Sequence, residues 1–182
     1  MAFHFNIQKT LQAISTILHW HGTKDMSYLR MIKLLYIADR ESIEETGQPI
    51  TGDRVVAMKY GPVLSSVYDL IKKGDTTDWP MWSEHFRTLG YRIEQIKEPG
   101  NGKLSKYEIG KLRDLTKRYE NESEWDLVEI THQFAEWKRN DPGMSSKAIP
   151  LAHILAAVGR SADEAAIVQE AHDQQAFDRL FA

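Results

Sequence analysis

Apolar residues recur at helical spacing along most of the chain. Near the start, one apolar stripe predicts a helix between Asn6, which can cap it, and Gly22, which ends it. The residues of this stripe, spaced by four, three and four positions, are Ile7, Leu11, Ile14 and Leu18. Such a stripe covers one face of a helix, so this helix is predicted to lie against a core.

A longer helix is predicted to run from Asp25 or Ser27 to about Thr46. Residues 28–38 are apolar on nearly every side, and a helix of that kind is buried all round. We therefore expect this segment to be the central helix of the core. Its far end, residues 39–45, is strongly charged and is expected to reach solvent before Gly47 stops the helix.

The middle of the chain is punctuated by glycine and proline. Residues 48–53 are predicted to form a loop, and residues 54–60 fit either a strand or a helix. Pro62 is expected to open a helix that ends at Gly74, followed by a connector over residues 75–80. Residues 91–97 and a partner around Lys103 are predicted to form a hairpin with its turn at residues 99–102.

Three or four further helices are predicted downstream. Ser105 with Glu108 makes a capping box, Ser123 opens a helix that Pro142 breaks, and Pro150 opens another. A second capping box is expected at residues 161–164, before an Ala-rich final helix. The predicted fold class is therefore α+β, mainly α: a compact bundle of six or seven helices around a buried central helix, with a small antiparallel β-hairpin or sheet.

The amino-acid composition excludes several kinds of site. The chain has 182 residues and no cysteine, which excludes disulfides, thiolate metal sites and cysteine nucleophiles. The missing cysteines fit a reducing cytoplasm, where we expect the protein to act. No apolar run approaches the roughly 20 residues that span a bilayer, and residues 1–13 do not resemble a secretory signal, so no membrane association is expected.

Charge is uneven along the chain. The formal net charge is −3, which makes broad binding to nucleic-acid phosphates unlikely to be its role. The basic segment over residues 106–118 scatters its charges around a predicted helix, so sequence-specific DNA binding is not expected. Residues 119–182 carry 12 acidic and 5 basic residues. This acidic part of the chain either binds a basic partner or forms a solvent-exposed face.

Catalytic and metal-binding patterns are not apparent in the sequence. Seven histidines occur without a His-Glu-x-x-His pattern, and no Gly-x-Ser-x-Gly elbow is present. Residues 100–105 lack the spacing of a phosphate-binding loop. Acidic pairs such as Asp39 with Glu41 fit a solvated helix surface. We expect no enzyme activity, no metal and no cofactor. A deep pocket with two or more titratable groups of shifted pKa would favour an enzyme instead.

Aromatic residues gather around the predicted connector. Trp79, Met81 and Trp82 lie there beside charged residues. On a loop, such side chains either fill the core or anchor a partner protein. The sequence leaves both alternatives open.

Several sequence blocks, in a fixed order, carry a family resemblance. Residues 30–40 read Arg-Met-Ile-Lys-Leu-Leu-Tyr-Ile-Ala-Asp-Arg, and residues 47–53 read Gly-Gln-Pro-Ile-Thr-Gly-Asp. Tyr-Gly-Pro-Val follows at residues 60–63, and Thr131-His132 and Trp137 lie further on. This order, over about residues 10–158, resembles the Panacea domain of the SocA-like antitoxin family. Arg30 and Ile32 depart from the Lys and Gln that are more usual in the family.

The resemblance implies a non-catalytic antitoxin that neutralises a cognate protein toxin by direct contact. The toxin would be encoded by a neighbouring gene, in bacterial or phage cytoplasm. Residues 1–158 would form the antitoxin domain, and residues 159–182 an acidic helical extension. The scaffold motif would hold the shape of the domain, with Tyr36 and Tyr68 filling the core. Its residues are Lys33, Leu34, Leu35, Tyr36, Tyr60, Gly61, Pro62, Val63 and Tyr68.

Five residues are candidates for contact with the toxin. Two lie at the charged end of the central helix, which we expect to be exposed, one in the following loop and two in the aromatic connector. They are Asp39, Arg40, Asp53, Trp79 and Trp82. An alternative function is a proteolytic adaptor, or another regulatory interaction protein, that delivers a client to a protease. The acidic extension would then be a second contact surface.

Overall fold

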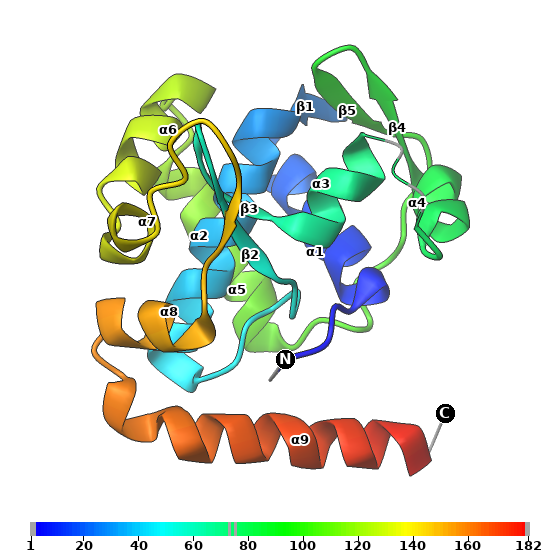
Figure 1. Ribbon diagram of the computed structural model, residues 1–182. Coiled ribbons are helices and arrows are strands. Elements are labelled where there is room, and N and C mark those ends of the chain that lie inside the picture. The colour runs from blue at the N-terminus through cyan, green and yellow to red at the C-terminus, as the bar shows by residue number, and fades with distance from the viewer. Residues whose placement is uncertain (1–2, 73, 75, 181–182) are drawn as a thin grey trace.

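Helix α2, Tyr28–Thr46, is the element around which the others pack (Figure 1). The computed structural model describes residues 3–72, 74 and 76–180, except for the side chain of residue 178. This part of the chain holds nine α-helices and two small antiparallel sheets, which confirms the predicted α+β, mainly α class. The helices besides α2 are α1 Ile7–His21, α3 Ser65–Ile71, α4 Trp79–His85, α5 Lys106–Arg118, α6 Glu124–His132, α7 Ala135–Arg139, α8 Leu151–Ala157 and α9 Glu164–Leu180.

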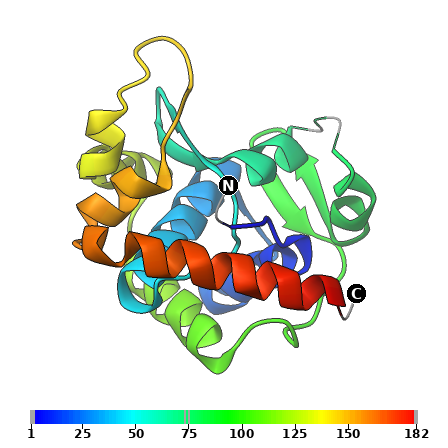
Figure 2. The same ribbon diagram turned by 60° about the horizontal axis from the view of Figure 1, so that its bottom comes forward.

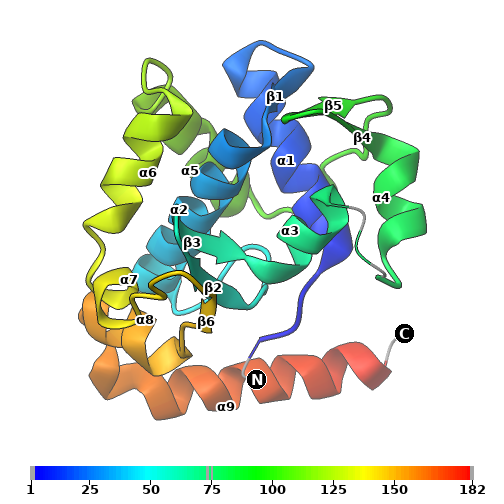
Figure 3. The ribbon, with the colours of Figure 1, turned by 45° about the horizontal axis from the view of Figure 1, so that its top comes forward.

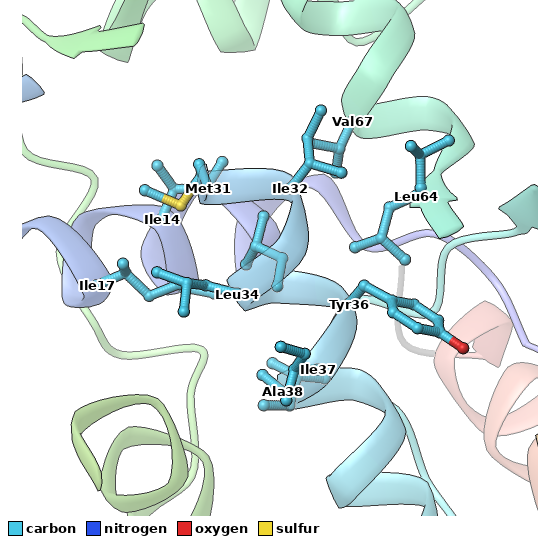
Figure 4. Packing of buried hydrophobic residues seen from close by; sticks show 14 of the residues in the cluster. Ile14, Ile17, Met31, Ile32, Leu34, Tyr36, Ile37, Ala38, Leu64 and Val67 are labelled. Atoms are coloured by element: carbon cyan, nitrogen blue, oxygen red, sulfur yellow. The ribbon is translucent and has the colours of Figure 1, made fainter. Parts of the chain in front are cut away.

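The prediction that α2 is buried all round is confirmed. From one side Ile14 and Ile17 of α1 reach Met31 and Leu34, as Figure 4 shows. From the other side, residues of β3 and α3 reach Ile32 and Tyr36 (Figure 4). Each large apolar side chain buried in this way contributes about 1.5–3 kcal/mol of transfer free energy. These contacts make α2 the centre of a single core.

Local capping signals fix several helix ends as predicted. Asn6 accepts a hydrogen bond from the backbone N–H of Lys9 at 3.0 Å and so caps α1. Gly47 ends α2 with a φ of 81°, in the left-handed region that favours glycine. Ser105 and Glu108 form the predicted capping box at the start of α5. These ends are set by residues close in sequence.

The six strands of the described residues form two separate sheets of three strands each. One sheet has the order β1-β5-β4 and the other β3-β2-β6. Figure 3 shows the first sheet and α4 on the opposite side of the molecule from α6 and α7. The strands are β1 Asp25–Ser27, β2 Val55–Met58, β3 Gly61–Leu64, β4 Phe86–Leu89, β5 Arg92–Gln95 and β6 Lys147–Ala148.

The predicted hairpin is wrong in register and partner. Strand β5 pairs with β4, Leu89 lies opposite Arg92, and the tight turn uses Gly90 with a φ of 59°. Residues 99–103 instead form a loop that Gln12 of α1 ties down. Its side chain donates to the carbonyl of Pro99 and accepts from the backbone N–H of Lys103. Because Gln12 is far away in sequence, the local turn residues did not indicate these two hydrogen bonds.

The predicted helix start at Pro62 is also wrong. Residues 61–64 form β3, which pairs with β2 and so settles residues 55–58 as a strand. Pro62 is tolerated because β3 lies at the edge of its sheet, where a missing N–H breaks no ladder. Helix α3 starts at Ser65, where the carboxylate of Asp53 accepts from the backbone N–H groups of Ser66 and Val67.

Two further segments differ from prediction. Trp79 opens a short helix, α4, where a connector was expected, and part of that connector, residue 75, lies outside the described residues. The single helix predicted after Ser123 is divided into α6 and α7 at residues 133–134. These short additional helices account for nine in place of six or seven.

Helix α9 lies along the outside of the domain (Figure 2). A 3₁₀ turn, Ser161–Asp163, replaces the predicted capping box before it. Ile167 and Ala171 are the buried apolar side chains that α9 contributes, and a Cβ on Gly47 would lie 3.1 Å from Cγ1 of Ile167. Arg160 donates to the carbonyls of Ile43 and Glu44, at 3.3 and 3.4 Å. The extension is thus anchored at the C-terminal end of α2.

Replacing Ile167 tests how α9 is held. We expect Ile167→Ala to lower the free energy of local opening of α9 by about 2 kcal/mol, because a buried side chain is truncated. Hydrogen exchange should then become roughly thirtyfold faster for amides of α9 and stay unchanged in α2. Val168→Ala, at a partly buried position of the same helix, is the matched control. An unchanged exchange rate in α9, or an equal increase of the exchange rate in α2, would contradict this anchoring.

Candidate functional site

Three polar residues of α2 share one face of the helix. Lys33, Tyr36 and Arg40 are spaced by three and four positions, so their side chains lie one above the other. This face meets β3, α6 and α7 (Figure 3). A buried helix face with polar side chains needs internal partners for each of them.

The ammonium group of Lys33 is fully buried and holds β3. Its Nζ donates to the carbonyl of Pro62 at 2.9 Å. Gly61 lies directly against it, with a φ of 93°. A Cβ at this position would lie 2.7 Å from Nζ of Lys33 and 2.7 Å from Oγ1 of Thr131. The Tyr-Gly-Pro block and the lysine of α2 therefore form one packing unit, in which only glycine fits.

Burial changes the titration of Lys33 and of its neighbour His132. Desolvation lowers the pKa of Lys33 to about 7. The pKa of His132 is lowered too, first by burial and then by the charge of Lys33. The imidazole stacks on Trp137, with ring centroids 4.1 Å apart, and Trp137 donates to the carbonyl of Met58 at 3.2 Å. This group joins α2 and β2 to α6 and α7.

Glu136 of α7 binds Tyr36 and Arg40, the other two residues of this helix face. Its Oε1 accepts from the hydroxyl of Tyr36 and from Nε of Arg40, each at 2.7 Å. The guanidinium of Arg40 also lies 4.2 Å from the ring centroid of Phe134. Burial, and then the charge of Glu136, raise the pKa of Tyr36. Removing one partner from such a buried pair is costly because the other charge is left without compensation.

Asp39 lies on an adjacent face of α2 and holds the loop that follows the helix. Its Oδ1 accepts from the backbone N–H groups of Ile50 and Thr51, each at 2.9 Å, and its Oδ2 accepts from the hydroxyl of Thr51. Burial raises the pKa of Asp39 to about 7 despite these donors. The prediction that Asp39 is exposed is wrong, since the residue is 3% exposed.

Asp53 plays a similar part at the far end of the loop. Its carboxylate accepts from the backbone N–H groups of Arg54, Ser66 and Val67, at 2.7, 3.1 and 3.0 Å. Desolvation raises its pKa. The residue thereby joins β2 to the start of α3 and is only partly exposed.

A hollow of about 270 Å³ lies between α2, this loop, β6 and α8. Tyr36, Asp39, Arg40 and Asp53 all line it. Two carboxylates of raised pKa beside an apolar wall are an arrangement that acid–base catalysts use. The apolar lining consists mainly of Phe3, Ile43, Pro49, Val55, Ala148, Ile149, Pro150, Leu151 and Ile154.

The hydrogen bonds of these carboxylates favour a structural role. Both oxygens of Asp39 and of Asp53 accept from donors of the chain's own loop and helix start. A general base needs a free lone pair directed at its substrate, and a general acid needs a proton directed there. Here the donors fix the backbone around the hollow instead.

The five candidate contact residues do not form one surface. The hollow brings together Asp39, Arg40 and Asp53, whereas Trp79 and Trp82 both lie in α4. Trp82 is 0% exposed and packs on Phe86, so the interpretation of this side chain as a partner anchor is wrong. Trp79 is half-buried against the core. The aromatic connector thus mostly fills the interior.

Glu136 is a member of the site that the sequence did not reveal. It lies in a charged segment, and nothing local distinguishes it from a surface glutamate. Its partners, Tyr36 and Arg40, are about a hundred residues away. Such a pair becomes visible only through the fold.

Among the described residues, no three His, Asp or Glu side chains gather as metal ligands would. No helix in the described ranges is both long and apolar enough to cross a membrane.

Comparison with known proteins gives a family for this arrangement. A family model described as "Antitoxin SocA-like, Panacea domain" matches residues 31–138. The chain belongs to this family. The match spans α2 to α7 and includes every residue of the scaffold motif. A search of curated proteins and a search of solved structures found no match.

Most of the Panacea motif residues hold the domain together from inside, but Tyr60, which was expected to belong to this scaffold, is 47% exposed. Tyr36 is fully buried, as predicted, whereas Tyr68 is half-buried with Nζ of Lys72 5.8 Å from its ring centroid. Arg30 also has an internal role. It donates to the carbonyls of Tyr119 and Glu122 and so holds the segment between α5 and α6.

The low pKa of Lys33 predicts a pH-dependent stability. The unfolded chain binds this proton more tightly than the folded chain, so protonation favours unfolding between about pH 7 and pH 10. We expect the free energy of unfolding to rise by on the order of 2 kcal/mol from pH 7 to pH 9. Urea denaturation at pH 7 and at pH 9 measures this change in the free energy of unfolding.

Two lysine variants separate this effect from other titrations. Lys33→Met should lose most of the rise between pH 7 and pH 9, because the variant has no buried ammonium group to discharge. Lys106→Met, at an exposed position at the start of α5, should keep it. The same rise in both variants would show that another group is responsible.

Proposed function

We propose that this Panacea-domain protein neutralises a cognate protein toxin by direct contact and catalyses no reaction. Membership of the SocA-like antitoxin family supports an antitoxin role. The observation that carries the proposal is the use of buried and partly buried polar side chains within the residues that match the family. Lys33, Asp39 and Asp53 all bind backbone groups of the same chain. Their chemistry maintains a shape, which is what a binding protein requires.

The toxin is expected to be the product of a neighbouring gene and to be met in bacterial or phage cytoplasm. A stable complex needs an interface of at least about 1,000 Å² with a few buried anchors. Arg40, Asp53 and Trp79 are partly exposed and remain candidates for its edge. The buried Asp39 and Trp82 act on binding only through the shape that they support. No cofactor is needed for this function.

Two of the basic residues of α5 are neutralised within the chain, which argues against nucleic acid as the partner. Lys111 pairs with Glu41 at 3.0 Å and with Glu45 at 2.5 Å, and Arg118 pairs with Glu41 at 2.5 Å. Cations neutralised in this way release few counterions on contact with phosphates. The partner we propose is therefore a protein.

A proteolytic adaptor is the second candidate function. Helix α9 lies outside the range of the family match, on the outer face of the domain (Figure 2). Glu170 and Asp173 are exposed on it. An adaptor needs a second surface for the protease, and α9 is separate enough from α6 and α7 to provide one.

Co-expression with the neighbouring gene tests the proposal. We expect that gene alone to arrest growth, and growth to return when this chain is expressed with it. An epitope-tagged toxin should stay at unchanged abundance during rescue, because binding blocks it without removing it. A protease-dependent fall in toxin abundance would favour the adaptor. A harmless neighbour, or a toxin that still arrests growth, would contradict the antitoxin role.

A further inference from the structure

Two large aromatic side chains meet on the surface beside α6. Tyr60, in the turn between β2 and β3, is 47% exposed, and Trp125, in the first turn of α6, is 56% exposed. Their ring centroids are 5.5 Å apart and their planes are inclined by 79°, an edge-to-face contact. The two side chains shield each other only in part, so they present a continuous apolar surface to solvent.

Trp125 and Trp20, the two exposed tryptophans among the described residues, differ in what covers their rings. Trp20 has Arg113 and Lys117 within 5.9 and 5.0 Å of its ring centroid. Within the described ranges, no Lys or Arg of this chain lies over the ring of Trp125. Its face is therefore open to a cation from another molecule.

The charges around this pair are acidic. The segment 119–130 has five acidic residues and no Lys or Arg. In the part of the chain that the structure describes, none of the five is ion-paired to a Lys or Arg, although Glu129 lies 4.0 Å from Nδ1 of His132. They are Glu120, Glu122, Glu124, Asp126 and Glu129.

Three cations of the chain lie near this surface and leave it acidic. Arg30 is largely buried behind it and donates to the carbonyls of Tyr119 and Glu122. Nζ of Lys59 lies 5.3 Å from the ring centroid of Tyr60. Arg92 is close enough to Glu124 to interact with its charge, but it is paired with Asp25. Five carboxylates outweigh these three charges. The acidic residues of α2, such as Glu41 and Glu45, are by contrast paired with Lys111 and Arg118.

We propose that this surface, the Trp125 patch, binds a basic segment of the toxin. The patch consists of Tyr60 and Trp125 with the surrounding carboxylates of Glu120, Glu124 and Glu129. A Lys or Arg side chain of the toxin lies over the ring of Trp125, and neighbouring basic residues face the carboxylates. This inference rests on the proposed function and assigns it a surface. Phosphate groups of nucleic acids or anionic lipids are repelled by the same charges.

The aromatic pair and the carboxylates have different parts in binding. Tyr and Trp are the side chains that most often dominate interface energy, because they bury a large area with little loss of conformational freedom. Exposed carboxylates at the rim mainly speed association and select a partner of opposite charge. The two contributions can therefore be tested with separate variants.

Trp125→Ala tests the aromatic anchor. The probe is the purified product of the neighbouring gene, titrated into the full-length chain in a calorimeter. We expect about thirtyfold weaker binding, as for the loss of an interface hot spot. Trp20→Ala, at another exposed tryptophan surrounded by basic residues, should bind as tightly as the unaltered chain. Thermal unfolding should be nearly unchanged in both variants, since both side chains are exposed.

Charge reversal tests the carboxylates that surround the aromatic pair. Glu120 and Glu129 are suited to this because, unlike Asp126, they cap no helix. The double variant Glu120→Lys with Glu129→Lys should associate about tenfold more slowly at low salt, and the difference should shrink in high salt. The matched control is Glu170→Lys with Asp173→Lys on α9, which should associate at the unaltered rate.

The outcomes separate this inference from the proposed function. Unaltered affinity in Trp125→Ala, with an unaltered association rate in the Glu120 and Glu129 variant, would overturn the Trp125 patch and leave the antitoxin role standing. Equal losses in the α9 control would move the interface to α9 and likewise overturn the patch. No binding by the unaltered chain would overturn both the patch and direct neutralisation.

Discussion

A helix that is buried on every side must find an internal partner for each polar side chain that it carries. Helix α2 carries several, and each reaches a different part of the chain. Lys33 holds the carbonyl of Pro62, Asp39 holds the loop after α2, and Tyr36 and Arg40 share Glu136 of α7. One helix thereby fixes β3, a loop and a second helix. The arrangement of the domain depends on these contacts.

This organisation separates shape from recognition. Apart from the exposed Tyr60, the family motif lies largely in the interior, where a change to Gly61 or Lys33 disturbs several elements together. The surface carries few of these constraints, so residues such as Trp125 can differ without loss of the fold. The carboxylates of Asp39 and Asp53, which line the hollow beside α2, accept hydrogen bonds from backbone N–H groups. A protein built in this way is suited to presenting a fixed surface to a partner.

Sequence predicted those features that neighbouring residues determine. Apolar spacing gave α1 and α2, and the pair Ser105 and Glu108 gave the start of α5. Long-range contacts account for the errors. Pro62 continues a strand because β2 pairs with it, and Asp39 is buried because a loop eleven residues away folds over it. Charge alone indicated a surface position for Asp39, and nothing local revealed that Glu136 is buried beside Tyr36.

Native mass spectrometry of the neutralised toxin tests most directly whether this protein acts by shape alone. The proposed function predicts a complex of defined stoichiometry in which both chains keep their unmodified masses. Toxin released from that complex by denaturation and refolding should be toxic again. A modified or cleaved toxin, recovered free of this chain and permanently inactive, would contradict the account.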